Sequence, residues 1–215
     1  TVGVRRATSL LDLGINMNLA PVLDSTNRGD FVYQRGFMND REVLGQALID
    51  AHTSKGVLAV PKHFPGYDDI SFNPEFHIIP KVPRVPDVRV FDGIESVIFM
   101  VSHVIYEPLD GVFPFPLSEQ GIGFAREILG ENIVLMSDDL LSRSFVGAYS
   151  LAEIGERSVR SGVDILLIAG YPDAASIGSF VDSLQANVEK DLFLQEQVQS
   201  SYKRIIQLKQ NTLGL

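Results

Sequence analysis

Titratable side chains are concentrated between residues 56 and 77, where the sequence reads GVLAVPKHFPGYDDISFNPEFH. An apolar run typical of a buried strand leads to Lys62 and His63, and the loop that follows carries Glu75 two residues before His77. A carboxylate at that spacing can orient an imidazole and adjust its basicity, as acid–base chemistry requires. The stretch therefore predicts a site of chemistry, although a histidine on a loop is more commonly an ordinary surface residue.

Carboxylates and histidines also lie at the ends of other apolar runs. Asp24 directly follows one run, Asp138 and Asp139 follow another, and His103 lies near the end of a third. From the local sequence, Asp138 suits a helix cap and a nucleophile equally well. Asp139 is assigned a structural role, because one of the two adjacent carboxylates, that of Asp138, has to point into the site while the other points elsewhere. His103 is either a core histidine or a contact for a ligand.

Five apolar runs are predicted to be buried strands, and helices separate them. The strands are expected at residues 15–23, 57–60, 96–104, 133–136 and 163–169. Helices are expected at residues 1–13, 40–55, 118–129, 150–161 and 190–210, with shorter ones at 88–94 and after Asp173. His52 is placed on the second of these helices with its side chain toward solvent. The alternation predicts a parallel sheet covered by helices.

Two α/β folds fit this alternation, a (β/α)8 barrel and a doubly wound sheet. In a barrel the carboxyl ends of the strands surround one site, and here they supply Asp24, Lys62, His63, His103 and Asp138. A doubly wound sheet usually carries a glycine-rich phosphate turn, which this sequence lacks. We therefore expect a TIM-type (β/α)8 barrel in which residues 1–215 form a single domain. The barrel is expected to be incomplete in this chain, because only five strands are recognisable.

Composition limits the class of ligand. The 215 residues are 45% hydrophobic and 21% charged, as in an ordinary globular domain, and the net charge of -9 argues against nucleic acid or anionic membrane as a partner. The chain has no cysteine, and its four histidines lack the spacing of a metal motif, so neither a metal nor another cofactor is expected. No apolar run is long enough to cross a bilayer. The compartment stays open between a cytoplasmic and an exported protein.

Four motifs follow one another along the chain. They are GINMNLAPVLD at residues 14–24, KHFPG at 62–66, MVSHV at 100–104 and SDDL at 137–140. In this order they resemble the glycoside hydrolase family 3 β-N-acetylhexosaminidases, bacterial enzymes of peptidoglycan recycling, over nearly the whole chain. The resemblance implies removal of terminal β-linked N-acetylglucosamine by a retaining mechanism, through a covalent glycosyl-enzyme. A β-glucosidase of the same family is the variant interpretation.

The resemblance also implies roles for single residues. It implies that Asp138 attacks the anomeric carbon, and that His77 is the general acid/base with Glu75 in place of the family's orienting aspartate. It further implies that Lys62 and His63 bind the sugar. Further substrate contacts are expected from Arg35, His103 and Asp24.

The chain departs from the family's motifs after KHFPG. Residues 67–70, YDDI, stand where the family has H-G-D-T, and the spacing to His77 is longer, so Asp69 is an alternative partner for that histidine. Nothing matches the family's earlier D-Q-E-G-G strand end, so we expect either a missing N-terminal segment or partner chain, or a shortened relative. A non-catalytic carbohydrate-binding protein is therefore the alternative from another class.

Overall fold

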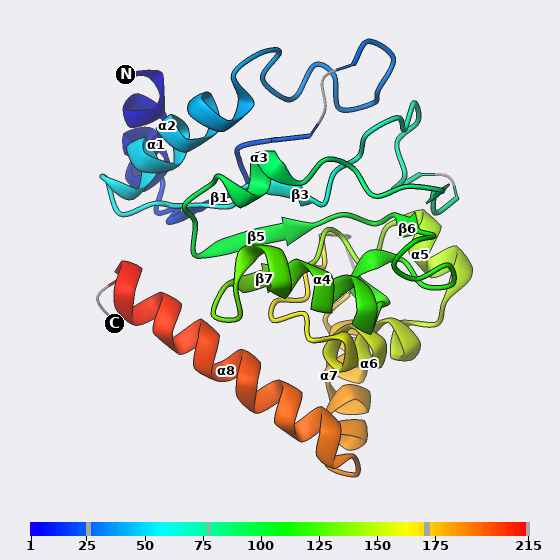
Figure 1. Cartoon of the computed structure of the whole chain (residues 1–215). Coiled ribbons are helices and arrows are strands. Elements are labelled where there is room, and N and C mark those ends of the chain that lie inside the picture. Colours follow the sequence, from blue (N-terminus) through cyan, green and yellow to red (C-terminus); the bar gives the residue numbers. More distant parts are fainter. Residues whose placement is uncertain (25–26, 77, 170–172, 214–215) are drawn as a thin grey trace.

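The computed structural model describes residues 1–24, 27–76, 78–169 and 173–213 (Figure 1). Its strands are β1 (Met17–Asn18), β2 (Leu58–Ala59), β3 (Lys62–Phe64), β4 (Lys81–Val82), β5 (Ile98–Val101), β6 (Ile105–Tyr106) and β7 (Val134–Met136). Its helices are α1 (Val2–Asp12), α2 (Arg41–Thr53), α3 (Arg89–Asp92), α4 (Glu119–Leu129), α5 (Arg143–Ala148), α6 (Leu151–Ser161), α7 (Ala174–Val188) and α8 (Leu192–Leu213), with a 3-10 turn at Phe115–Leu117.

The main strands pair in parallel and in chain order. β1 pairs with β2, β3 continues the chain after β2 and pairs with β5, and β5 pairs with β7. A parallel bridge from Val22 to Lys62 joins the segment after β1 to β3, and another from Met136 to Ile165 adds one more segment beside β7. The order never reverses, as in a barrel and unlike a doubly wound sheet. The α/β fold with parallel strands is confirmed, and within the described residues the strands form an open arc.

Alternate side chains of the strands enter two different cores. Ala59, Phe99 and Leu135 pack in a cluster with Ile49 of α2 and Ile122 of α4. The residues between them in the strands face the other way and pack with α8; they are Leu58, Val60, Ile98, Met100, Val134 and Met136, against Leu208 and Ile205. Both faces of the arc are therefore covered, which explains the unbroken apolar runs of the strands.

Three helices begin at the caps that the sequence predicts. Ser118 accepts a hydrogen bond from the N–H of Gly121 at the start of α4, and Asp173 does the same for Ser176 in α7. α6 begins with a complete capping box between Ser150 and Glu153.

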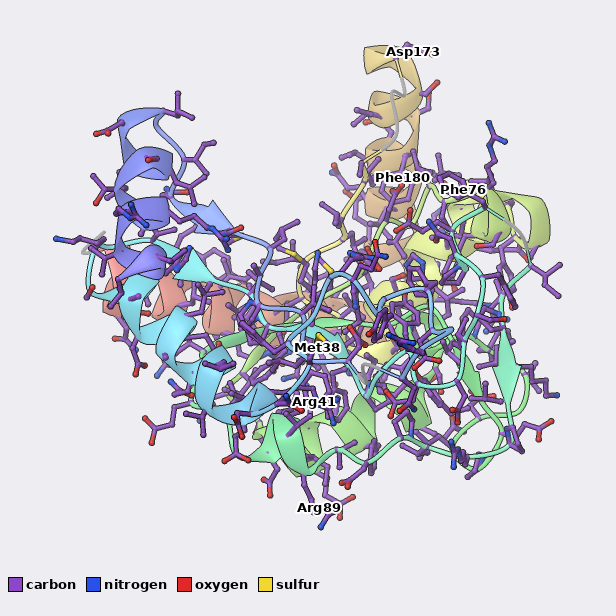
Figure 2. The ribbon with its side chains drawn as sticks, turned by 90° about the horizontal axis from the view of Figure 1, so that it is seen from above. Met38, Arg41, Phe76, Arg89, Asp173 and Phe180 are labelled. Carbon is purple, nitrogen blue, oxygen red and sulfur yellow. The ribbon has the colours of Figure 1, made fainter. Side chains whose placement is uncertain are left out.

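Seen from above, α1 and α7 lie toward opposite ends of the arc (Figure 2).

A buried carboxylate joins α8 to the segment that bridges to β7. Asp164 lies next to the bridge at Ile165, and its side chain is 0% exposed. It accepts hydrogen bonds from Ser201 and Arg204 of α8, from Arg126 of α4 and from the N–H of Leu135 in β7, at distances between 2.7 and 3.0 Å. One side chain therefore ties four elements together.

The predicted exposure of His52 is wrong, because this residue is fully buried. Its Nδ1 lies 2.8 Å from the carbonyl oxygen of Leu48, and its Nε2 lies 2.9 Å from the side-chain nitrogen of Asn18. Both ring nitrogens thus have partners, which removes the main cost of burying an imidazole. His52 fastens α2 to β1 and takes no part in the candidate site.

Candidate active site

The carboxyl ends of the first two strands hold a buried Asp24–His63 pair. Nδ1 of His63 lies 2.7 Å from Oδ2 of Asp24, and each residue is 1% exposed. The backbone N–H groups of His63 and Tyr67 donate to the same carboxylate at 3.2 and 2.8 Å. Asp24 thereby fixes one ring nitrogen of His63 and sets the direction in which the other nitrogen points.

Asp138, at the end of β7, lies on the far side of this imidazole. Nε2 of His63 is 3.7 Å from Oδ2 of Asp138, and the hydroxyl of Tyr67 donates to that oxygen at 3.1 Å. The other carboxylate oxygen, Oδ1, accepts from the N–H of Asp139 at 3.0 Å. The Tyr67 hydroxyl accepts in turn from the N–H of His103 at 3.0 Å. Groups from four strand ends thus converge around the hydroxyl of Tyr67 and the carboxylate of Asp138.

The surroundings of Asp138 favour its ionised form. Burial acts to raise the pKa of this carboxyl, but the imidazoles of His103 and His63, the N–H of Asp139 and the ammonium of Lys62 act more strongly together, so the pKa lies below its ordinary value. A carboxylate that stays ionised and is held from two directions is suited to attack an electrophilic carbon.

Lys62, Arg35 and Glu75 form the charged surroundings of Asp138. Burial lowers the pKa of Lys62, while the charge of Asp138 opposes that shift. Burial and the charge of Asp138 both raise the pKa of Glu75, while Arg35 opposes the shift. The loop holding Glu75 is anchored locally, because Asn73 accepts from the N–H of Glu75 at 2.9 Å. The carbonyl of Glu75 also accepts from the N–H of Ser144 at 3.3 Å.

His103 is buried against the ring of Phe145, with the two ring centres 4.4 Å apart. Neither ring nitrogen has a hydrogen-bond partner of normal geometry among the described residues. Burial lowers the pKa of His103 and outweighs the charge and the nearby backbone of Asp138, which favour the protonated ring. An imidazole without a partner is costly in a protein interior, and such groups call for a specific explanation.

The segment at residues 163–169, where the structure has a single bridge at Ile165 in place of the predicted strand, supports the segment that carries Asp138. The N–H of Leu167 donates to Oγ of Ser137 at 2.9 Å, and the N–H of Ala169 donates to Oδ1 of Asp139 at 2.9 Å. Asp139 also accepts from the N–H of Leu141. One oxygen of its carboxylate, Oδ1, thus accepts from two backbone groups, which agrees with the structural role expected for it.

The structure brings most of the predicted site residues together and leaves their roles as predictions. Asp24, Lys62, His63, His103 and Asp138 meet at the strand ends, with Arg35 and Glu75 in electrostatic range. His77 lies outside the described residues, and the carboxylate of Asp69 pairs with Arg84. Asp24 is fully used in holding His63 and Tyr67, so its contact with a sugar stays a prediction.

Tyr67 is a site residue to which the sequence analysis assigned no role. A lone tyrosine after a turn has no partner at a characteristic spacing that would mark it.

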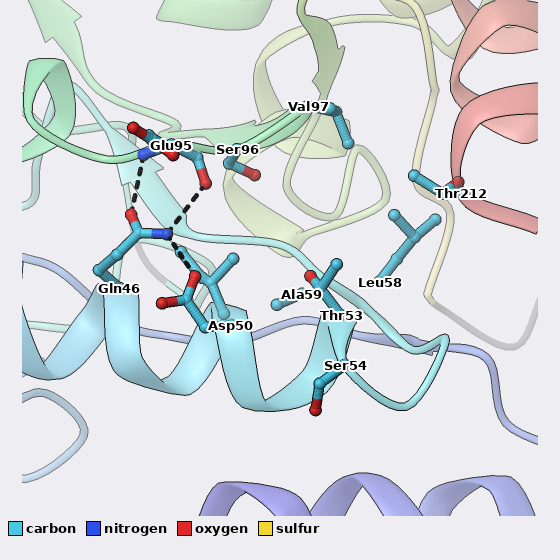
Figure 3. A pocket seen from close by; sticks show the side chains of 11 residues that line it. Gln46, Asp50, Thr53, Ser54, Leu58, Ala59, Glu95, Ser96, Val97 and Thr212 are labelled. Carbon is cyan, nitrogen blue, oxygen red and sulfur yellow. Dashed lines mark hydrogen bonds between the residues drawn. The ribbon is translucent and has the colours of Figure 1, made fainter.

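A cavity of about 630 Å³ lies near the opposite ends of the strands, between α2, β2, the segment before β5 and the end of α8 (Figure 3). Polar groups on its wall already pair with one another: the side chain of Gln46 bonds to Asp50 and to both backbone groups of Glu95. None of the predicted site residues lines it. We assign it no catalytic role, because sites of barrel enzymes lie at the carboxyl ends of the strands.

Two features are absent from the described residues. No cluster of three or more histidine, aspartate or glutamate side chains is placed to hold a metal ion. No helix in that part of the chain is long and apolar enough to span a membrane.

The chain is similar in sequence to known proteins. A family model described as the glycosyl hydrolase family 3 N-terminal domain matches residues 1–208. A beta-hexosaminidase of Methylobacillus flagellatus is 31% identical over 86% of this chain and 55% of its own length. An uncharacterised secreted glycosyl hydrolase of Arthroderma benhamiae is 29% identical over 93% of this chain and 61% of its own length. The chain thus spans little more than half the length of these curated relatives.

Solved structures support the same relationship. A family 3 beta-N-acetylglucosaminidase from Paenibacillus sp. matches 98% of this chain and 43% of its own, with a TM-score of 0.86 and 28% identity. A beta-N-acetylhexosaminidase from Beutenbergia cavernae matches 96% of this chain and 66% of its own in fold, with a TM-score of 0.85 and 24% identity. The matching domains are TIM-barrel-like, so the predicted barrel-type fold is confirmed, with the arc as part of such a barrel.

Proposed function

The chain belongs to glycosyl hydrolase family 3, and on that premise we propose that it carries the catalytic centre of a retaining glycosidase that removes terminal β-linked N-acetylglucosamine. The observation that carries the proposal is the ionised, doubly held carboxylate of Asp138 beside His63 at the carboxyl ends of the strands. The names of the relatives support the choice of sugar.

In the proposed reaction Asp138 is the nucleophile. One of its oxygens forms a bond to the anomeric carbon while the bond to the leaving oxygen breaks, and an acid gives that oxygen a proton. Water then attacks the anomeric carbon, passes a proton to the same group, and the bond between carbon and Asp138 breaks. The low pKa of Asp138 keeps the carboxylate ready for the first step and makes it a good leaving group in the second.

The loop after β3 is proposed to supply the acid. We assign proton transfer to His77, with Glu75 orienting its imidazole. Burial, and then the charge of Asp138, raise the pKa of Glu75, and the second effect supports a place for Glu75 near the nucleophile. We assign the binding of sugar hydroxyls to the cations Lys62 and Arg35, to His63, and to the unpaired ring of His103.

The test is hydrolysis of an aryl N-acetylglucosaminide by the full-length protein. We expect Asp138→Asn to lower kcat by about 10³-fold or more, because a missing nucleophile removes the main reaction route. Asp50→Asn, on α2 at the other end of the strands, is the matched control and should keep wild-type turnover. A fluorinated N-acetylglucosaminide with an activated leaving group should label Asp138, which peptide mass spectrometry would locate. If Asp138→Asn stays within a few-fold of wild type, the assignment of the nucleophile is wrong.

Two other functions would give different results in the same assay. A β-glucosidase of this family would turn over an aryl glucoside faster than the N-acetylglucosaminide. A non-catalytic carbohydrate-binding protein is favoured by the altered loop at residues 67–70, and calorimetry would then show sugar binding without turnover of either substrate.

A further inference from the structure

Tyr67 connects both halves of the site. Its N–H donates to Asp24 at 2.8 Å, and its hydroxyl donates to Asp138 at 3.1 Å. Its ring packs against the imidazole of His63, with the ring centres 4.6 Å apart, and against Phe31 at 5.2 Å. The residue is 1% exposed, so these contacts are made away from bulk water.

The direction of the hydroxyl proton follows from its neighbours. The N–H of His103 donates to the Tyr67 oxygen, so the single hydroxyl proton is free to point at Asp138. Burial, and then the charge of Asp138, raise the pKa of Tyr67 well above its ordinary value. The hydroxyl therefore stays protonated and remains a donor at neutral pH.

We propose that Tyr67 is a positioning residue whose hydroxyl holds Asp138 in its ionised form and assists its release from the glycosyl-enzyme; the second half of this inference rests on the proposed function. A hydrogen bond to a carboxylate is stronger than one to a neutral ester. The bond from Tyr67 is therefore strong in the free enzyme, weakens when Asp138 is esterified, and strengthens again as water displaces the carboxylate. Its contribution falls on the second step, in which the electron pair of the broken bond returns to Asp138.

A matched control lies in the same part of the structure. Tyr106 is also buried, at 2% exposure, and its hydroxyl donates to the carbonyl of Gly66 at 2.6 Å and lies 2.8 Å from Oγ of Ser102. Changing Tyr106 to phenylalanine removes a buried hydroxyl from the neighbourhood of the loop without touching Asp138. Tyr67→Phe keeps the ring contacts with His63 and Phe31 and removes only the hydroxyl.

The first measurement needs no turnover. The carboxyl carbon of Asp138, identified by its absence in Asp138→Asn, is titrated by nuclear magnetic resonance in wild type, Tyr67→Phe and Tyr106→Phe. We expect the pKa of Asp138 to rise in Tyr67→Phe, because a donor to the ionised form is lost, and to stay at the wild-type value in Tyr106→Phe. An Asp138 pKa that is equal in wild type and Tyr67→Phe would overturn the inference, whether or not the protein is active.

The second measurement tests the release of Asp138. With an activated aryl substrate, for which release from the enzyme limits the rate, Tyr67→Phe should lower kcat by about tenfold and lower KM in parallel, leaving kcat/KM within a few-fold. A purely structural loss would lower kcat and kcat/KM together, and that result would refute the role in release. Absence of turnover in wild type would instead refute the proposed function, and the titration would still decide whether Tyr67 holds Asp138.

Discussion

Removal of the Asp164 carboxylate should destabilise the protein more than most single substitutions. In Asp164→Ala, the guanidinium groups of Arg126 and Arg204, whose side chains are 10% and 13% exposed, would lose their shared partner. Burial already lowers the pKa of Arg126, which shows that its charge is poorly solvated. Breaking a buried ion pair by removing one partner costs about 3–5 kcal/mol. That loss is a large share of the roughly 5–15 kcal/mol that stabilises an ordinary domain.

The assay is urea unfolding of the full-length protein, followed by circular dichroism. Asp164→Asn keeps the size of the side chain and an acceptor oxygen, so it should lose less stability than Asp164→Ala. If the alanine variant does not fold, the loss measured for Asp164→Asn tests the same prediction. The matched control is Glu107→Ala, which removes an exposed partner of Lys81 at 3.6 Å and should cost no more than about 0.5 kcal/mol. A loss below about 1 kcal/mol for Asp164→Ala would refute the reasoning, because the two arginines would then have found other partners or water.

Two further predictions concern a helix cap and a carboxyl of the candidate site. Ser150→Ala removes half of the capping box of α6 and should lower the free energy of unfolding by about 1 kcal/mol. The control Ser54→Ala, at the end of α2, should change this free energy little. Equal effects of the two substitutions in urea unfolding would contradict the prediction. Glu75 has a folded-state pKa above its unfolded value, so its contribution to stability is present below pH 4.5 and is lost as pH rises through the folded-state pKa. Glu75→Gln should therefore gain stability relative to wild type between about pH 4 and 7, and a constant difference across that range would count against a raised pKa.

The arc could be predicted because its signals are local. Each buried strand is a short apolar run, and each run ends where polar side chains begin, so Lys62, His63 and Asp138 stood out before any contact was known. The parallel order then brings those ends together. The capping box at Ser150 is equally local, since two side chains three residues apart complete it.

Other features depend on contacts between distant parts of the chain. His52 has an ordinary helical position, and only the amide of Asn18 on β1 explains its burial. The two-residue strands β4 and β6 pair with each other but are too short to show a period. Tyr67 acquires its place from three partners that lie 36 to 71 positions away in the sequence.

The ring of His63 is oriented by a residue from a neighbouring strand, and this has a consequence for how the site can evolve. Its orientation is set by Asp24, which follows the neighbouring strand, and the long loop after Gly66 reaches this carboxylate through the N–H of its first residue, Tyr67. Mutations can therefore accumulate in most of this loop, and the preference for one sugar over another can drift, while the nucleophile and its histidine keep their geometry.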